Sequence, residues 1–239
     1  MDTTTELLPF DAEIGKALAV VAHPDDLEYG AAALVAAWTN AGHDVVYLLA
    51  TRGEAGIDGM APPVAGPLRE AEQRASAAVV GVTIVEFLDH SDGVIENGPR
   101  LRRDIAGAIR RHRPDTLLLF NHRETWGPGR LNSPDHRAVG AAALDAIGDA
   151  GNRWIFEDLG LEPHRVRQAL VAGSPAATHA VDVTDTVDMA VASLREHRAY
   201  LEGLGDHPMA DPEFIRMFFE TTGLRFGGRP AVAFEVFSF

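Results

Sequence analysis

Short apolar runs alternate with longer stretches of helical composition through residues 16–147 of this 239-residue chain. Continuously apolar runs are typical of strands buried on both faces of a parallel sheet, and the stretches between them have the period or composition of helices. The predicted strands span residues 17–21, 44–50, 83–88 and 116–120, and the predicted helices span 27–40, 68–80, 101–112 and 135–147. This alternation predicts an α/β fold: a single Rossmann-like, doubly wound domain with a mainly parallel sheet.

The remainder of the chain continues the pattern. Strands are predicted at 167–172, 179–183 and 231–237, and helices at 186–201 and 212–221. No repeat, low-complexity segment or linker interrupts the sequence, so we interpret residues 1–239 as one domain with 1–14 as an N-terminal extension. Two segments rich in proline and glycine are predicted to be loops. We expect the first, 57–67, to be a mobile lid, and the length of the second, 121–134, indicates function.

The composition disfavours several classes of function. A formal net charge of −14 argues against nonspecific binding to nucleic acid or to an anionic membrane. The absence of cysteine excludes disulfides, thiolate zinc sites and cysteine nucleophiles, and it fits a reducing cytoplasm. No signal peptide is visible, and no apolar run approaches the roughly 18 residues of a membrane span. We therefore expect a cytoplasmic protein that binds neither nucleic acid nor membrane.

Three side chains with metal-binding or catalytic chemistry follow the first predicted strand. The imidazole of His23 and the carboxylates of Asp25 and Asp26 converge where that strand ends, the edge at which open α/β sheets bind ligands. The residue before a proline favours extended backbone, so Pro24 should keep His23 at the end of the strand. A capped strand end with solvated acids is the alternative, but adjacent carboxylates repel each other unless a cation offsets their charge. We therefore favour a metal site with a spare carboxylate as base.

Such a site needs a third ligand, and His136 is the best candidate. It lies at the start of the helix that follows the fourth strand, hence on the same side of the sheet. We interpret Asp135 as the N-cap of this helix, with Pro134 just outside it, and as a group that orients a neighbour. Taken alone, a histidine at a helix start is more often a surface residue. Its pairing with His23 and Asp26 changes that preference.

Other polar residues are candidates to line the site. Arg69 and Glu72 are three positions apart on one helix, which indicates either a surface ion pair or an arginine that Glu72 holds toward the pocket. Arg52 and Glu54 follow the second strand. Asp92 lies in a predicted turn after the third strand, where a carboxylate suits sugar hydroxyls.

Four motifs resemble, in order, those of the LmbE/PIG-L family of zinc-dependent N-deacetylases. They are Ala22-His23-Pro24-Asp25-Asp26, Thr51-Arg52-Gly53-Glu54, Arg69-Glu70-Ala71-Glu72 and Pro134-Asp135-His136-Arg137-Ala138-Val139. The resemblance covers residues 16–147 and implies a Rossmann-like fold that hydrolyses N-acetyl groups, mostly on glucosamine units. It also implies a small-molecule substrate. The sequence does not give the oligomeric state, but family members are often oligomers, so a homo-oligomer is an expectation from the resemblance.

The resemblance carries specific roles to matching positions. It implies one zinc ion per chain, with other divalent metals as alternatives, and three ligands: His23, Asp26 and His136. Asp25 matches the general base, and Arg69 and Asp92 match positions near the sugar ring. Trp126, in the second loop, is a further candidate for substrate contact. Three further residues are candidates to orient the residues that bind metal or substrate: Asp135, Ser133 and Glu72.

One departure from the family pattern concerns protonation. The family usually has a histidine three residues before the last ligand, held by the aspartate that matches Asp135; here that position is Ser133. A tyrosine found nearby in some members is replaced by Leu131. Two routes remain for the proton of the departing amine: Asp25 makes both transfers, or a loop histidine reaches in. We favour Asp25 for both transfers, with His122 as an oxyanion donor if its side chain points inward.

The sequence thus predicts a zinc-dependent hydrolase that removes an N-acetyl group from a small amino-sugar conjugate such as an N-acetylglucosaminide. An amidase of thiol conjugates and a non-catalytic metal- or sugar-binding relative are the alternatives. A nucleotide-binding enzyme is disfavoured, because the turn after the first strand lacks glycine and its carboxylates repel phosphate.

Overall fold

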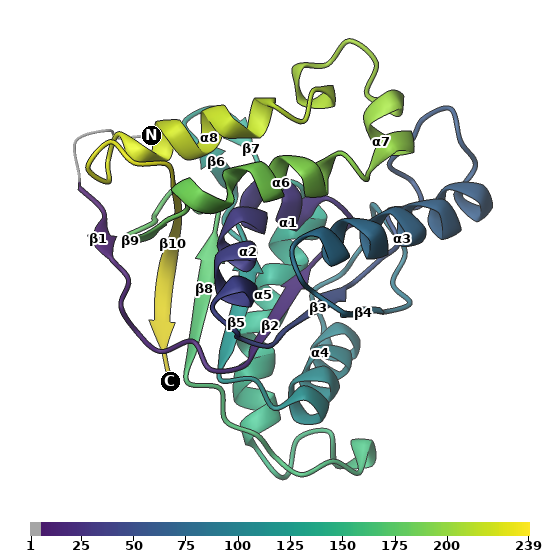
Figure 1. Cartoon of the computed structure of the whole chain (residues 1–239). Helices are drawn as coiled ribbons and strands as arrows, with labels where there is room; N and C mark the ends of the chain where they lie inside the picture. Colours follow the sequence, from purple (N-terminus) through teal and green to yellow (C-terminus); the bar gives the residue numbers. More distant parts are fainter. Residues whose placement is uncertain (1–5) are drawn as a thin grey trace.

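Eight strands form the central sheet of the computed structural model, which describes residues 6–239 (Figure 1). Their order across the sheet is β1-β9-β10-β8-β5-β2-β3-β4. The bounds are β1 Leu8–Pro9, β2 Ala17–Val21, β3 Val45–Leu49, β4 Ile84–Phe87, β5 Thr116–Phe120, β8 Gln168–Ala172, β9 His179–Asp182 and β10 Ala231–Ser238. Only β10 runs antiparallel to its neighbours among these eight strands. The predicted α/β class and mainly parallel sheet are therefore confirmed.

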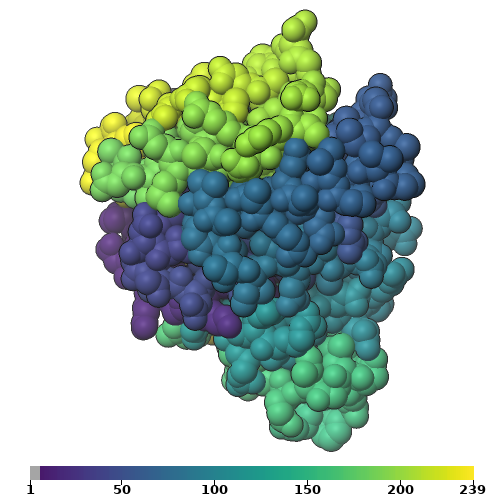
Figure 2. Space-filling model, turned by 45° about the vertical axis from the view of Figure 1, so that its right-hand side comes forward, coloured from purple at the N-terminus to yellow at the C-terminus, as the bar shows by residue number. Residues whose placement is uncertain are grey.

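Helices cover both faces of the sheet. Their bounds are α1 Asp26–Gly30, α2 Ala32–Asn40, α3 Pro62–Val79, α4 Pro99–His112, α5 Pro134–Gly151, α6 Val187–Leu194, α7 Arg198–Gly203 and α8 Phe214–Gly223. One hydrophobic core joins the sheet to α4 and α5, and the other joins its opposite face to α2, α3, α6 and α8. Figure 2 shows the later segments, green to yellow, packed against the blue surface of α3. The central strands are thus buried on both faces, which explains their continuously apolar runs.

The two central strands β2 and β5 mark the point where the chain changes sides. The helices after β2 pack on one face, whereas α5, after β5, packs on the other. A crevice forms between such diverging connections, outside the carboxyl ends of the strands, and this is where doubly wound folds bind ligands.

Some expected elements are placed differently. The predicted lid at 57–67 is wrong in part, because α3 begins at Pro62, with Pro62 and Pro63 in its first turn, where a proline costs no hydrogen bond. The helix expected at 27–40 is divided at Ala31, whose φ of −150° is not helical. The helix expected at 186–201 is likewise divided into α6 and α7.

Smaller elements complete the fold. The loop at 121–134 contains a two-stranded hairpin, β6 Thr125–Gly127 and β7 Arg130–Leu131. Three short 3-10 helices span Glu157–Leu159, Thr184–Thr186 and Pro208–Ala210. Part of the expected N-terminal extension joins the sheet as β1, while residues 1–5 of it lie outside the described part of the chain. Within residues 6–239, no helix is long and apolar enough to cross a membrane.

Candidate metal centre

The turn between β2 and α1 presents His23 and Asp26 to the crevice. Asp26 folds back over the strand end, where its Oδ2 accepts hydrogen bonds from the backbone N–H groups of Ala22 at 3.0 Å and of His23 at 2.9 Å. Its other oxygen, Oδ1, lies 3.6 Å from Nδ1 of His23. The backbone therefore fixes the carboxylate and leaves Oδ1 facing the imidazole.

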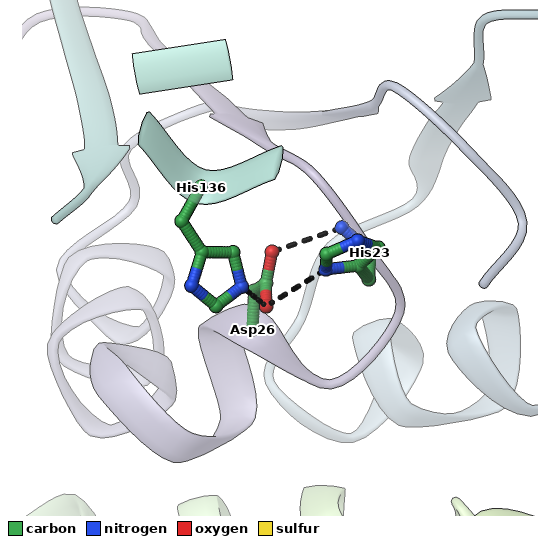
Figure 3. Close-up of side chains that lie close together, drawn as sticks. All are labelled: His23, Asp26 and His136. Carbon is green, nitrogen blue, oxygen red and sulfur yellow. Dashed lines mark hydrogen bonds and ion pairs between the residues drawn. The ribbon is translucent and has the colours of Figure 1, made fainter. Parts of the chain in front are cut away.

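The first turn of α5 brings His136 to the same carboxylate from across the sheet. Its Nε2 lies 2.9 Å from Asp26 Oδ1 (Figure 3). The predicted N-cap is corrected here: Ser133 caps the helix by accepting a hydrogen bond from the N–H of Asp135 at 3.2 Å, and Pro134 occupies the first helical position. A Ser-Pro pair is a usual helix start, so the sequence did contain the signal for this boundary.

His23, Asp26 and His136 form a candidate metal centre. Each offers one ligand atom, and the three atoms lie within 4.8 Å of one another. Two imidazole nitrogens and one carboxylate oxygen are ligands that suit zinc, and three protein ligands leave a fourth position open in a tetrahedral site. The residues present therefore fit a divalent cation.

The electrostatics of the three residues favour a positive charge between them. Burial opposes ionisation of Asp26, but His136 and His23 outweigh it and hold the pKa of Asp26 far below its usual range. Burial also opposes charge on His23, yet Asp26, Asp135 and Asp92 together raise the pKa of His23 well above its usual value. Carboxylates that stabilise a cationic ring also stabilise a bound cation.

Two carboxylates orient the His23 ring from its other edge. Nε2 of His23 lies 3.1 Å from Oδ2 of Asp135 and 3.1 Å from Oδ1 of Asp92. Asp135 is itself fixed by the backbone N–H groups of Gly93 at 2.7 Å and Ile95 at 3.1 Å. With its proton on Nε2 between these acceptors, the ring presents the lone pair of Nδ1 to the centre, the arrangement found around many metal-binding histidines.

Asp25 lies beside the centre in a strained backbone conformation. Its φ of 78° is left-handed, and its N–H donates to Oε1 of Gln73 at 3.0 Å. Its Oδ2 accepts a hydrogen bond from Arg69, whereas its Oδ1 has no partner among the described residues and is not sealed from solvent. Burial raises the pKa of Asp25 from its ordinary value of 3.8 to about 6, against the opposing effect of Arg69. A carboxylate with this pKa and one unbonded oxygen suits a general base.

Arg69 is buried, and it holds the turn that carries Asp25. Its guanidinium donates to the carbonyl oxygens of Gly53 at 2.8 Å and Pro24 at 2.9 Å, and it lies 4.4 Å from the ring centre of Tyr200. The surface ion pair predicted for Arg69 and Glu72 is wrong, because Arg69 is buried and directed toward Asp25, as the alternative expected. The part given to Glu72 in that alternative is wrong, because Glu72 accepts from the N–H of Ala199 at 2.6 Å. Ala199 belongs to α7, which packs on α3.

The residues after β3 divide between two roles. Glu54 accepts hydrogen bonds from the N–H groups of Arg52 at 3.1 Å and Asp92 at 3.0 Å, so it supports the loop that presents Asp92 to His23. The side chain of Arg52 turns away to Glu70 and Asp89, at 2.9 and 3.1 Å. The structure therefore brings Glu54 and Asp92 to the site but not the Arg52 guanidinium.

Trp126 and His122 lie on different sides of the 121–134 loop. The Trp126 ring packs edge-on against the His136 ring, with centroids 5.7 Å apart. His122 is not brought to the centre: its ring packs at 6.3 Å from that of Phe237, and its Cβ abuts Gly140 of α5. Burial lowers the pKa of His122, but no partner of His122 among residues 6–239 belongs to the metal centre. His122 is therefore not placed to be the expected oxyanion donor.

Sequence reasoning missed three residues beside the site: Gln73, Asn132 and Tyr200. Gln73 lies four positions after Arg69 on α3, and both contact Asp25, so their helical spacing was a usable signal. Tyr200 reaches the site through the packing of α7 on α3, for which the sequence has no local signal.

Comparisons with known proteins agree with this geometry. A sequence model of the PIG-L family, described as GlcNAc-PI de-N-acetylase, matches residues 18–147. The chain is 31% identical over 196 residues to diacetylchitobiose deacetylase of Thermococcus kodakarensis. The matched region covers 80% of this chain and 72% of that protein. It is 28% identical over 137 residues to a probable N-acetyl-alpha-D-glucosaminyl L-malate deacetylase 2 of Bacillus anthracis, covering 54% of this chain and 58% of that protein.

A solved structure also shares the fold. N,N'-diacetylchitobiose deacetylase from Pyrococcus horikoshii superposes with a TM-score of 0.83, covering 95% of this chain and 85% of its own at 22% sequence identity. At this identity the likeness shows the fold, while the family is shown by the sequence matches.

Proposed function

The chain belongs to the PIG-L family, and on this basis we propose that it is a zinc-dependent hydrolase that removes an N-acetyl group from a small amino-sugar conjugate such as an N-acetylglucosaminide. The observation that carries the proposal is the convergence of His23, Asp26 and His136 beside the buried carboxylate of Asp25. The substrate class is supported by the two curated relatives, whose names describe deacetylases of diacetylchitobiose and of N-acetylglucosaminyl malate. A cytoplasmic location and a homo-oligomer stay predictions from the sequence.

His23, Asp26 and His136 would hold a zinc ion, which would supply a Lewis acid and lower the pKa of water at the site to about 7. Asp25 has the properties of the base that takes a proton from the attacking water. Its pKa of about 6 leaves it mostly ionised at neutral pH, and its Oδ1 is unbonded. Positioned general bases contribute about 10²–10⁴-fold to rate.

Asp25 is also the group best suited to return the proton. When the C–N bond breaks, the acyl group leaves as a carboxylic acid and the departing amine needs a proton. The Ser133 hydroxyl caps α5, and His122 packs against Phe237, so neither faces the centre. Protonated Asp25, with a pKa near 6, is acidic enough to release its proton to an amine.

The proposal is tested with the zinc-loaded protein and a panel of N-acetylated amino sugars that includes diacetylchitobiose and N-acetylglucosaminyl malate. Mass spectrometry should detect the loss of an acetyl group with the wild type and almost none with Asp25→Asn, which keeps all three metal ligands. Product from an amide-linked thiol conjugate alone would favour the amidase alternative. No product from any compound, or equal product from Asp25→Asn, would contradict the proposal.

A further inference from the structure

Asn132 joins the hairpin loop to the metal centre through a complete set of hydrogen bonds. It is only 5% exposed. Its Nδ2 donates to the backbone carbonyl oxygens of Asn121 at 2.7 Å and Arg123 at 2.9 Å. Its Oδ1 lies 2.8 Å from the N–H of Ser133 and 3.0 Å from Nδ1 of His136. Two donors and two acceptor positions are therefore all used.

The two carbonyl oxygens decide which way the Asn132 amide points. A carbonyl oxygen can only accept, so the NH₂ group must face Asn121 and Arg123, and Oδ1 must face Ser133 and His136. An amide oxygen accepts but cannot donate. Nδ1 of His136 must then carry a proton to complete the hydrogen bond.

This requirement determines which nitrogen of His136 is available to a metal. A neutral imidazole with its proton on Nδ1 has its lone pair on Nε2, and Nε2 is the atom that faces Asp26 Oδ1 at 2.9 Å. A lone pair and a carboxylate oxygen at this separation repel each other unless a proton or a metal cation lies between them, so a metal would take the place of a proton on Nε2. The hydrogen bond from Nδ1 and the proposed cation at Nε2 are thus complementary.

We propose that Asn132 is a positioning residue that fixes the metal-binding tautomer and orientation of the His136 ring. The proposal rests on the proposed zinc centre. We infer that Asn132 raises the affinity of His136 for the metal through its Oδ1, which accepts from Nδ1, and not only by anchoring the hairpin. Outer partners of metal-binding histidines typically contribute about 10–100-fold to metal affinity.

Two substitutions at Asn132 separate these roles. Asn132→Leu is close in size but removes both the acceptor for His136 and the donors to the hairpin. Asn132→Asp also removes the donors to Asn121 and Arg123 but keeps an oxygen that accepts from Nδ1. Asn121→Ala is the matched control, because the Asn121 side chain holds the same loop, through Thr125 O and the N–H of Arg123, without contacting His136.

The measurement is the zinc dissociation constant, from competition with a chelator at pH 7.5, with circular dichroism as the check on folding. We expect Asn132→Leu to weaken zinc binding about 10–100-fold, and Asn132→Asp and Asn121→Ala to stay close to the wild type. The proposal is overturned if Asn132→Leu binds zinc like the wild type, or if Asn132→Asp is weakened as much as Asn132→Leu, which would indicate loop anchoring alone.

The same titrations distinguish this inference from the proposed function. His136→Ala, measured in parallel, should lose most of the affinity. Weak binding by His136→Ala with unchanged binding by Asn132→Leu rejects the role of Asn132 and leaves the zinc centre intact. A wild type that binds zinc no better than His136→Ala rejects the centre itself, and the role of Asn132 with it.

Discussion

Replacing Asp25 by asparagine should stabilise the metal-free protein while abolishing its activity. The Asp25 side chain is 10% exposed, and burial raises its pKa from 3.8 to about 6 even though Arg69 acts in the opposite direction. Each pKa unit corresponds to about 1.4 kcal/mol, so an ionised Asp25 costs the fold about 3 kcal/mol at pH 8. Asparagine has the same shape, cannot ionise and tolerates a left-handed backbone, which this position requires at φ 78°.

The sign of the pH dependence follows from the same shift. The folded protein binds the Asp25 proton more tightly than the unfolded chain does, so wild-type stability decreases as the pH rises from about 4 through 6. The advantage of Asp25→Asn over the wild type should therefore be about 3 kcal/mol at pH 8 and about half of that at pH 5.

Urea unfolding of chelator-treated protein at both pH values measures this difference, provided that the slope with urea is the same for both proteins. Asp92→Asn is the matched control from the same site. Burial raises the pKa of Asp92, but the hydrogen bond and charge of His23, with smaller effects of the Ala55 N–H and Arg69, together outweigh burial and hold that pKa below its ordinary value. Asp92→Asn should thus lower the stability at pH 8. Equal midpoints for Asp25→Asn and the wild type, or a gap that does not change with pH, would refute the reasoning.

Three further outcomes are expected. His136→Ala should lose bound zinc and turnover together; metal analysis showing a full zinc content would remove His136 from the ligand set. In the wild type, kcat/KM should fall about tenfold per pH unit below 6, because Asp25 must be ionised to act as base, and a profile that stays flat to pH 5 would exclude this role. Arg69→Met removes the cation that lowers the pKa of Asp25, so the acidic limb of that profile should move to higher pH; an unmoved limb would show that Arg69 does not act through Asp25.

The sequence was sufficient to predict the central strands, because a strand that is buried on both faces has a continuous run of apolar residues. The strands β2 and β5 have the predicted bounds, and their apolar runs face hydrophobic cores on both sides. Helix ends were less well predicted. Pro62 and Pro63 were taken as loop residues, although proline is compatible with the first turn of a helix. The break at Ala31 follows Gly30, and glycine is disfavoured inside a helix, so the sequence did contain a weak signal for this break.

At the site, neighbouring residues were predicted correctly where spacing along one element decided the geometry. His23 and Asp26 share one turn, and the parallel sheet places His136 at the same edge. Arg69 was harder, because its helix offered Glu72 as a local partner, whereas the side chain is directed toward Asp25 by packing that involves Tyr200 of α7. Contacts between distant segments decide such cases, and a single sequence does not contain them.

Ser133 connects the departure from the family pattern to the tuning of Asp25. Its hydroxyl oxygen accepts from the N–H of Asp135 and caps α5, so it helps to place His136. A site without a histidine at this position needs one group that both takes and returns a proton, and such a group works best with a pKa near the working pH. Burial brings the pKa of Asp25 to about 6, within reach of neutrality. The burial that makes Asp25 costly to the fold is thus the property that lets one carboxylate serve as both base and acid.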